Sequence, residues 1–136
     1  MASTGYSGTP LVRKLGLKPG FRATVTYPPD HYRQLLAAEP PDMRWLGARA
    51  RKLDFVHLFV LREKDLARRL PIELGRIVAN GMIWVSWPKK ASKVATDVTE
   101  DTVRKHALPL GLVDIKVCAV DEVWSGLKLV IRVENR

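Results

Sequence analysis

The side chains best suited to chemistry gather in one stretch, "WPKKASKVATDVTED", at residues 87 to 101. It directly follows the apolar run "MIWVS" and presents Lys89, Lys90 and Lys93 close together. Lysine ammonium groups hold anions as point charges, and the hydroxyls of Ser92 and Thr96 add hydrogen-bond donors. The stretch therefore predicts a site for an anionic ligand. The alternative is a solvated basic loop in which Thr96 and Asp97 only cap the helix that follows.

The other reactive side chains are better explained by structure than by chemistry. His31, His57 and His106 lie on separate elements without the spacing of metal ligands, so no metal site is expected. Of these, His57 falls inside an apolar run and is interpreted as a hydrogen-bonded core residue. Cys118 alternates with Val120 in an expected strand, beside no evident base, and is interpreted as core rather than as a nucleophile. No catalytic residue is assigned.

Strands and helices are expected to alternate along the chain, and together they determine where the lysine stretch lies. Runs of β-branched and aromatic residues predict strands, and capped amphipathic segments predict helices. Strands are expected at residues 22–27, 43–46, 54–61, 82–87, 113–120 and 126–133, and helices at 9–15, 30–39, 62–80 and 99–108. Thr9 and Asp30 are the expected N-caps of the first two helices, and Asn80–Gly81 is expected to end the third.

The pattern of the strands predicts the fold class. The run at 54–61 is apolar on both faces, which is typical of a central parallel strand covered on both sides. Only "DEVWSG" separates the last two strands, which predicts an antiparallel hairpin. We therefore expect a three-layer α/β fold with a Rossmann-like, mainly parallel sheet and an antiparallel C-terminal hairpin strand. Residues 47–53 form a short link for a parallel crossover, so the pairing of the strand near Met43 is left open.

Length and composition indicate one domain, residues 1–136, in which residues 1–8 are expected to be flexible. The formal net charge is +9, from 23 Lys and Arg against 14 Asp and Glu, which favours anionic partners such as nucleic acid or phosphorylated metabolites. The single Cys118 is compatible with a reducing cytoplasm, where the protein is expected to act. No apolar stretch approaches the roughly 18 residues of a membrane span, so no membrane partner is expected.

Ligands of open α/β sheets bind beyond the carboxyl ends of the strands, and five segments are expected to converge there. They are "GYSGT" before the first helix, "TYPPDH", "LREKD", "WPKKASK" and the hairpin turn "DEVWSG". Trp124 is expected either to stack on a ring of the ligand or to cover the sheet edge, and Gly126 to supply a positive φ in a tight turn. The predicted ligand-binding residues are Tyr6, Ser7, Thr9, Lys89, Lys90, Ser92, Lys93, Thr96, Trp124, Ser125 and Gly126.

The chain runs from "LGLKPG" before the first strand, through a buried strand that begins at Asp54 and the strand "MIWVSWPK", to a final hairpin. This order resembles the frame of the class I S-adenosylmethionine-dependent methyltransferases, and the resemblance implies their fold. The cofactor parts of that family are missing. Pro28 and Pro29 stand where the family has a glycine-rich turn, and residues 47–49 lack the acid that holds the ribose. Binding of S-adenosylmethionine is therefore not expected, and no cofactor is assigned.

Three longer segments are "GYSGTPLVRKLGLKPG", "WPKKASKVATDVTED" and "VDEVWSGLKLV". They resemble an uncharacterised bacterial family, the domain of unknown function number 3052. This resemblance spans the chain and implies no reaction, ligand or partner.

The expected function is that of a non-catalytic binding module for an anionic ligand or partner at the strand-carboxyl edge, rather than that of an enzyme. One alternative is a small enzyme acting on a phosphorylated or nucleotide substrate, with Asp121 or Asp97 beside the lysines. Another is a subunit of a larger assembly, which would expose Trp45 or Trp124 in an apolar patch. Binding of nucleic acid is expected to be weak and independent of sequence, because no reading motif is present. The oligomeric state is left open.

Overall fold

The computed structural model describes residues 9–136, so the expected site residues Tyr6 and Ser7, and the segment 1–8 as a whole, lie outside the described residues. The strands are β1 (Arg22–Thr26), β2 (Arg44–Trp45), β3 (Leu53–Phe59), β4 (Ile77–Pro88), β5 (Leu112–Ala119) and β6 (Trp124–Ile131). The α-helices are α1 (Leu11–Leu15), α2 (Tyr32–Leu36), α3 (Glu63–Leu74) and α4 (Glu100–Ala107). Short 3₁₀ turns lie at η1 (Lys90–Ser92), η2 (Leu108–Leu110) and η3 (Val133–Asn135).

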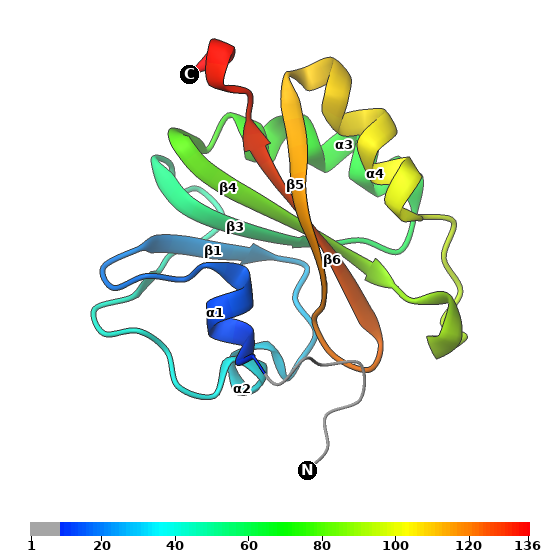
Figure 1. The fold of residues 1–136 in the computed structure, drawn as a ribbon, viewed down its shortest axis with the longest axis horizontal. Coiled ribbons are helices and arrows are strands. Elements are labelled where there is room, and N and C mark those ends of the chain that lie inside the picture. Colours follow the sequence, from blue (N-terminus) through cyan, green and yellow to red (C-terminus); the bar gives the residue numbers. More distant parts are fainter. Residues whose placement is uncertain (1–8) are drawn as a thin grey trace.

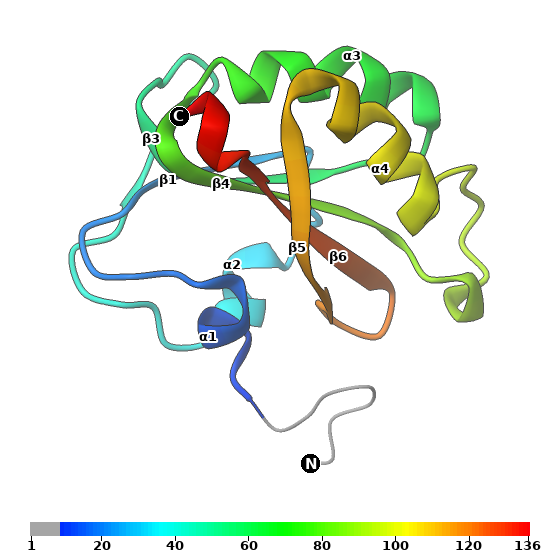
Figure 2. The same cartoon turned by 45° about the horizontal axis from the view of Figure 1, so that its top comes forward.

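One mixed sheet crosses the molecule in the order β2-β1-β3-β4-β6-β5 (Figure 1). β1 pairs in parallel with β2 and β3, and β3 pairs in parallel with β4, whereas β6 runs antiparallel to both β4 and β5. α3 and α4 cover one face of the sheet, and α1 and α2 cover the other (Figure 2). The predicted three-layer α/β fold, with its parallel centre and antiparallel C-terminal hairpin, is confirmed.

The central strand β3 is apolar on both sides because each face of the sheet carries a layer of helices. Phe55 and Phe59 pack in the cluster beneath α1 and α2, whereas Val56 and Leu58 pack in the cluster beneath α3 and α4. None of the four is more than 2% exposed. Burying each such side chain stabilises the fold by about 1.5–3 kcal/mol. The expected central parallel strand is confirmed.

The third helix ends earlier than the sequence indicates. α3 stops at Leu74 and β4 already begins at Ile77, so the expected end at Asn80–Gly81 is wrong. Gly81 instead serves the strand, because a Cβ atom there would lie 2.9 Å from the carbonyl oxygen of Leu53. This close approach accompanies a register shift between β3 and β4, a place where strands often require glycine.

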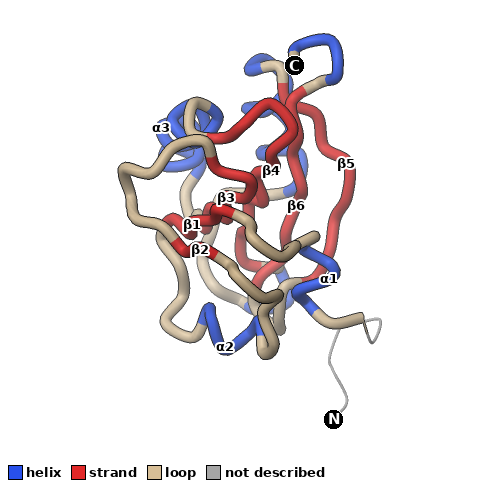
Figure 3. The backbone as a smooth tube through the Cα atoms, turned by 90° about the vertical axis from the view of Figure 1, so that its left-hand side faces the viewer, coloured by secondary structure: helices blue, strands red, loops and turns tan. Residues whose placement is uncertain are grey.

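The short link between the second and third strands is explained by the place of β2 (Figure 3). β2 pairs in parallel with the first residues of β1, with Arg44 opposite Arg22. Because β2 ends beside the beginning of β1, residues 47–52 have little distance to cover before β3 starts. No crossover helix is needed there.

The helices of the described residues are short, and none has the length and apolar character needed to cross a membrane. α1 follows Pro10 and α2 follows His31, and neither helix has a side-chain cap. The expected caps Thr9 and Asp30 are therefore wrong. The carboxylate of Asp30 is exposed instead, at the edge where β1 ends.

Candidate functional site

The lysine stretch and the β5–β6 turn meet at the carboxyl edge of the sheet. Pro88 at the end of β4 pairs with Trp124 at the start of β6, and the Lys89 N–H donates a 2.7 Å hydrogen bond to the Val123 carbonyl oxygen. The expected convergence of these two segments is confirmed. Of the third expected segment, only Thr9 is described, and it lies two residues before α1, the helix that covers the face of the sheet away from α4 (Figure 2).

A groove of about 730 Å³, the lysine groove, lies beside the lysines and next to the start of α4. Its lining includes the core residues Trp87 and Val98. Its polar lining consists of Lys89, Lys90, Lys93, Thr96, Thr99, Glu100 and Ser125. Five of the predicted site residues are thus brought together. Ligand binding by them stays a prediction.

Trp124 and Ser125 begin β6 rather than lying in the turn, and they point to opposite faces of the sheet because neighbouring strand residues alternate. Ser125 lines the lysine groove. The Trp124 ring packs edge-on against Phe59, with ring centroids 4.9 Å apart, in the layer of α1 and α2. The sheet therefore separates Trp124 from the lysines, so Trp124 and the lysines cannot line one site.

The hydroxyls of Ser92 and Thr96 shape the lysine loop. Ser92 Oγ donates to the carbonyl oxygen of Lys89, and Thr96 Oγ1 donates to that of Leu61, each at 2.7 Å. Each hydroxyl also accepts the backbone N–H two residues further along. Both side chains are therefore occupied in holding the loop.

Gly126 is required by packing rather than by backbone conformation. It lies within β6 and does not adopt a positive φ, so that expectation is wrong. A Cβ atom at this position would lie 3.1 Å from Trp84 Cε3 and 3.2 Å from both Ser86 Oγ and Val120 Cγ2. Glycine lets β6 pass close to the large ring of Trp84 on β4.

The acids that follow the lysines have structural roles. Asp97 Oδ1 accepts the backbone N–H of Glu63 at 2.6 Å and so caps α3, while Thr99 and Thr102 form a capping box at the start of α4. Glu100 pairs with an arginine of the same helix. Asp97 is therefore explained without a catalytic role.

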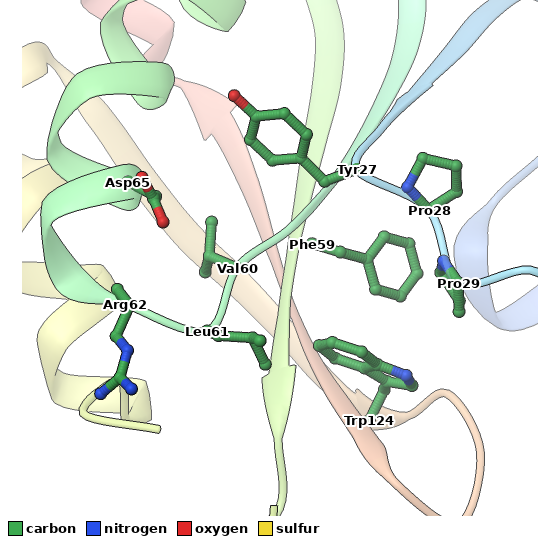
Figure 4. Close-up of a pocket in the computed structure, with 9 residues that line it drawn as sticks. All are labelled: Tyr27, Pro28, Pro29, Phe59, Val60, Leu61, Arg62, Asp65 and Trp124. Atoms are coloured by element: carbon green, nitrogen blue, oxygen red, sulfur yellow. The ribbon is translucent and has the colours of Figure 1, made fainter. Parts of the chain in front are cut away.

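Two further cavities flank the turn after β1, where the sequence predicts a ligand-edge loop but no site residue. The first, the β1–β3 cavity, has a volume of about 450 Å³. It is lined by Tyr27, Pro28, Pro29, Phe59, Val60, Leu61, Arg62, Asp65 and Trp124 (Figure 4). A rigid proline turn directly after a buried parallel strand is the sequence signal that points here.

The second, the β1–β2 cavity, has a volume of about 410 Å³. It is lined by Val25, Pro28, Pro29, Asp30, Tyr32, Arg33, Gln34, Trp45 and Leu46. Pro28 and Pro29 line both cavities, so the two lie on either side of a single turn at the carboxyl end of β1.

This turn begins with a strained residue. Tyr27 has a φ of +57°, in the left-handed region that favours glycine and costs other residues about 1–2 kcal/mol. Arg68 Nη2 donates to its hydroxyl at 3.0 Å, and the Arg69 guanidinium lies 5.9 Å from its ring centre. Strain of this kind persists only where surrounding contacts hold it, and it clusters at functional sites.

A buried hydrogen-bond chain ties the turn to the sheet. His57 of β3 is fully buried, with Nδ1 2.9 Å from Tyr32 Oη and Nε2 2.8 Å from Ser86 Oγ. Tyr32 in turn donates its backbone N–H to the Pro29 carbonyl oxygen. Burial lowers the pKa of His57 to about 3 and raises the pKa of Tyr32, so both side chains stay uncharged. The expected core histidine is confirmed.

A second contact joins the same turn to the β5–β6 turn. Asp121 Oδ1 accepts the backbone N–H groups of Val123 and Trp124, both at 2.8 Å, and its Oδ2 lies 3.2 Å from His31 Nε2. The carboxylate therefore positions Trp124 at the wall of the β1–β3 cavity and connects it to the residue that precedes α2.

Among residues 9–136, no group of three or more His, Cys, Asp and Glu side chains is placed to hold a metal ion. Cys118 is half-buried, and burial raises the pKa of its thiol, which disfavours the reactive thiolate.

No protein-family model and no curated protein matches the sequence. Solved structures do match. TrmN from Thermus thermophilus is similar over 90% of this chain, with a TM-score of 0.57 and 13% identity, and the chain spans 47% of its length. A SAM-dependent methyltransferase from Aquifex aeolicus gives a TM-score of 0.59 and 12% identity, over 90% of this chain and 88% of that one. The fold is that of the class I methyltransferases.

Magnesium protoporphyrin IX methyltransferase from Synechocystis PCC 6803, with bound SAM, has this fold too, with a TM-score of 0.59 and 12% identity over 90% of this chain and 74% of its own. These neighbours correct the expected function. A non-catalytic binding module is contradicted, and so is the expectation that the chain is not an enzyme, because the structures that share the fold include methyltransferases.

Proposed function

We propose that the protein is an enzyme of the S-adenosylmethionine-dependent methyltransferase type, which holds its methyl donor across the β1–β3 and β1–β2 cavities. The position of these cavities carries the proposal. They flank one turn at the carboxyl end of β1, the edge at which open α/β sheets bind ligands. When bound, the cofactor supplies a methyl group activated by a sulfonium centre.

The charged groups of the β1–β3 cavity fit the amino-acid end of this cofactor. Arg62 and Asp65 lie on the α3 side of the cavity, opposite Pro28 and Pro29 (Figure 4). The guanidinium of Arg62 is exposed and forms no ion pair within residues 9–136, while Asp65 makes only a 3.5 Å contact with Arg68. Arg62, whose guanidinium points away from the prolines in Figure 4, would turn into the cavity to hold the carboxylate through paired N–H donors, and Asp65 would accept from the ammonium.

The aromatic wall of the same cavity fits a cationic sulfur. Phe59 and Trp124 pack edge to face, and Tyr27 closes the other side. Aromatic faces attract ligand cations, and the attraction is stronger where water is excluded. The chain thus offers an electron-rich surface where the methyl group would be held.

The β1–β2 cavity fits the nucleoside end. Val25, Trp45 and Leu46 supply apolar walls, and the Asp30 carboxylate also lines the cavity. Asp30 forms no ion pair in the described part of the chain, so its oxygens are available to accept hydrogen bonds from ribose hydroxyls. Asp30 would take the place of the acid that residues 47–49 lack.

The turn between the cavities departs from the family pattern. Pro28 and Pro29 have no backbone N–H to offer, so side chains must supply the polar contacts. The left-handed backbone of Tyr27 nevertheless makes the sharp turn that glycine would otherwise allow. The described residues therefore fit the cofactor through side chains rather than through turn amides.

Isothermal titration calorimetry with S-adenosylmethionine tests the proposal. We expect micromolar affinity for the wild-type protein, and an affinity at least about tenfold weaker for Arg62→Ala, because a charge-assisted contact is lost. Arg13→Ala, which removes an exposed arginine of α1, is the matched control and should bind like the wild type. No binding at millimolar cofactor by protein shown to be folded by circular dichroism would contradict the proposal.

We also propose that the chain belongs to the bacterial family numbered 3052 and acts in the cytoplasm. The three segments quoted for that resemblance support the first point, and the single half-buried Cys118 thiol supports the second. Since one cysteine can form only a mixed or intermolecular disulfide, mass spectrometry of intact and alkylated protein from its host should find neither at Cys118 if the compartment is reducing.

A further inference from the structure

The lysine groove lies on the other side of the end of β4 from the β1–β3 cavity, and it carries more positive than negative charge. Lys89, Lys90 and Lys93 form no ion pair among residues 9–136. The acid that lines the groove, Glu100, is paired with Arg104, which in turn also contacts two other carboxylates. Three lysines and one glutamate therefore line the groove, which leaves its lining with a net charge of +2.

The loop that carries these lysines is held in place. Its first residue, Lys89, is bonded through its N–H to the β5–β6 turn, and Ser92 is bonded back to Lys89. Lys93 has a φ of +64°, a left-handed conformation that a lysine rarely adopts. A strained, ordered loop loses less conformational freedom on binding than a mobile one. The backbone that carries the three lysines is thus ordered in advance of a ligand, while their long side chains stay flexible.

The remaining polar groups of the groove select the kind of ligand. The hydroxyl of Ser125 has no hydrogen-bond partner in the part of the chain that the structure describes, whereas the Thr96 and Thr99 hydroxyls are occupied. The free groups are therefore three ammonium donors and one hydroxyl. A ligand that is anionic and rich in acceptors, such as a phosphate group, satisfies them.

We propose that the lysine groove binds phosphate groups of the molecule that receives the methyl group, through Lys89, Lys90, Lys93 and Ser125. Ser125 lines this groove and Trp124, the residue before it, lines the β1–β3 cavity. The two sites lie on opposite faces of the sheet, so a substrate that occupies both must pass around the carboxyl edge where β4 ends and β6 begins. That the bound molecule is the methyl acceptor rests on the proposed function, whereas the phosphate site itself does not.

Calorimetric titration with tripolyphosphate at low salt tests the site. The triple variant Lys89→Gln, Lys90→Gln and Lys93→Gln should bind at least about tenfold more weakly than the wild type, because phosphate contacts of lysine are charge-assisted. A control triple variant, Arg13→Gln, Lys18→Gln and Arg49→Gln, loses the same charge at exposed positions elsewhere and should weaken binding by less than about twofold. Equal weakening in both variants, or no binding by the wild type, would overturn the proposal.

Lys93→Asn separates charge from backbone strain, because asparagine tolerates the left-handed conformation. It should keep the thermal stability of the wild type and still weaken tripolyphosphate binding severalfold, whereas Lys93→Arg should retain binding. Wild-type affinity in Lys93→Asn would remove Lys93 from the site and count against the proposal.

Competition distinguishes the source of the phosphates. Two competitors of tripolyphosphate are compared: a single-stranded RNA oligonucleotide and a nucleoside triphosphate. If the RNA displaces tripolyphosphate at the lower concentration, the acceptor is a nucleic acid. If the nucleoside triphosphate does so, the acceptor is a small phosphorylated molecule.

The triple lysine variant should bind S-adenosylmethionine as the wild type does. If neither protein binds that cofactor while tripolyphosphate still requires the lysines, the phosphate site stands and the proposed function fails.

Discussion

Burial in the fold holds the side chain of His57 in its neutral form. The unfolded chain protonates this imidazole near its ordinary pKa of 6.5, whereas the folded chain resists protonation down to about 3. Between these values the unfolded state binds more protons, so the free energy of unfolding falls as the pH drops, by about 1.4 kcal/mol per pH unit. His57→Gln, whose amide does not titrate, should remove this slope in urea unfolding measured from about pH 4 to about pH 6.5.

His106→Gln provides the control for that measurement. His106 is only partly buried and contacts Glu63 at 2.7 Å, so its replacement leaves the buried chain of Tyr32, His57 and Ser86 intact. This variant should keep the part of the slope that belongs to His57. The same pH dependence in His57→Gln and in the wild type would show that the fold does not hold His57 neutral.

At the scale of elements, one buried carboxylate ties α3 to the sheet. Glu73 is fully buried, pairs with Arg76 at 2.8 Å and Arg69 at 2.7 Å, and accepts from Thr26 Oγ1 at 2.6 Å. Glu73→Ala leaves the buried Arg76 uncompensated, so we expect the free energy of unfolding in urea to fall by about 3–5 kcal/mol. Glu134→Ala, which breaks an exposed pair, should cause no measurable change. A similar small effect for Glu73→Ala would contradict this role.

At the scale of the whole molecule, the net charge of +9 predicts weak binding of nucleic acid without preference for sequence. Fluorescence anisotropy with two unrelated single-stranded oligonucleotides should give similar affinities. Both affinities should fall steeply between about 50 and about 200 mM salt, because phosphate contacts release counterions. Binding that persists at several hundred millimolar salt, or that strongly prefers one oligonucleotide, would speak against this prediction.

The sequence by itself determined the layers of the fold, its parallel centre and its terminal hairpin. These features follow from periodicity within single segments, such as the two-sided apolar run of β3, and from the short turn before β6. The same topology placed the lysine stretch and the β5–β6 turn at one edge, because the direction of each strand follows from the alternation of strands and helices.

Only the tertiary structure decided where the cavities lie and which side chains share them. Trp124 and Ser125 are neighbours in sequence, yet the sheet separates them into different sites. Conversely, Trp45 and Asp30 come from different elements and line one cavity. The start of β4 at Ile77 likewise depends on its pairing with Leu53, which no local pattern contains. Cavities and strand ends arise from long-range contacts, whereas periodicity reports only which face of each element is buried.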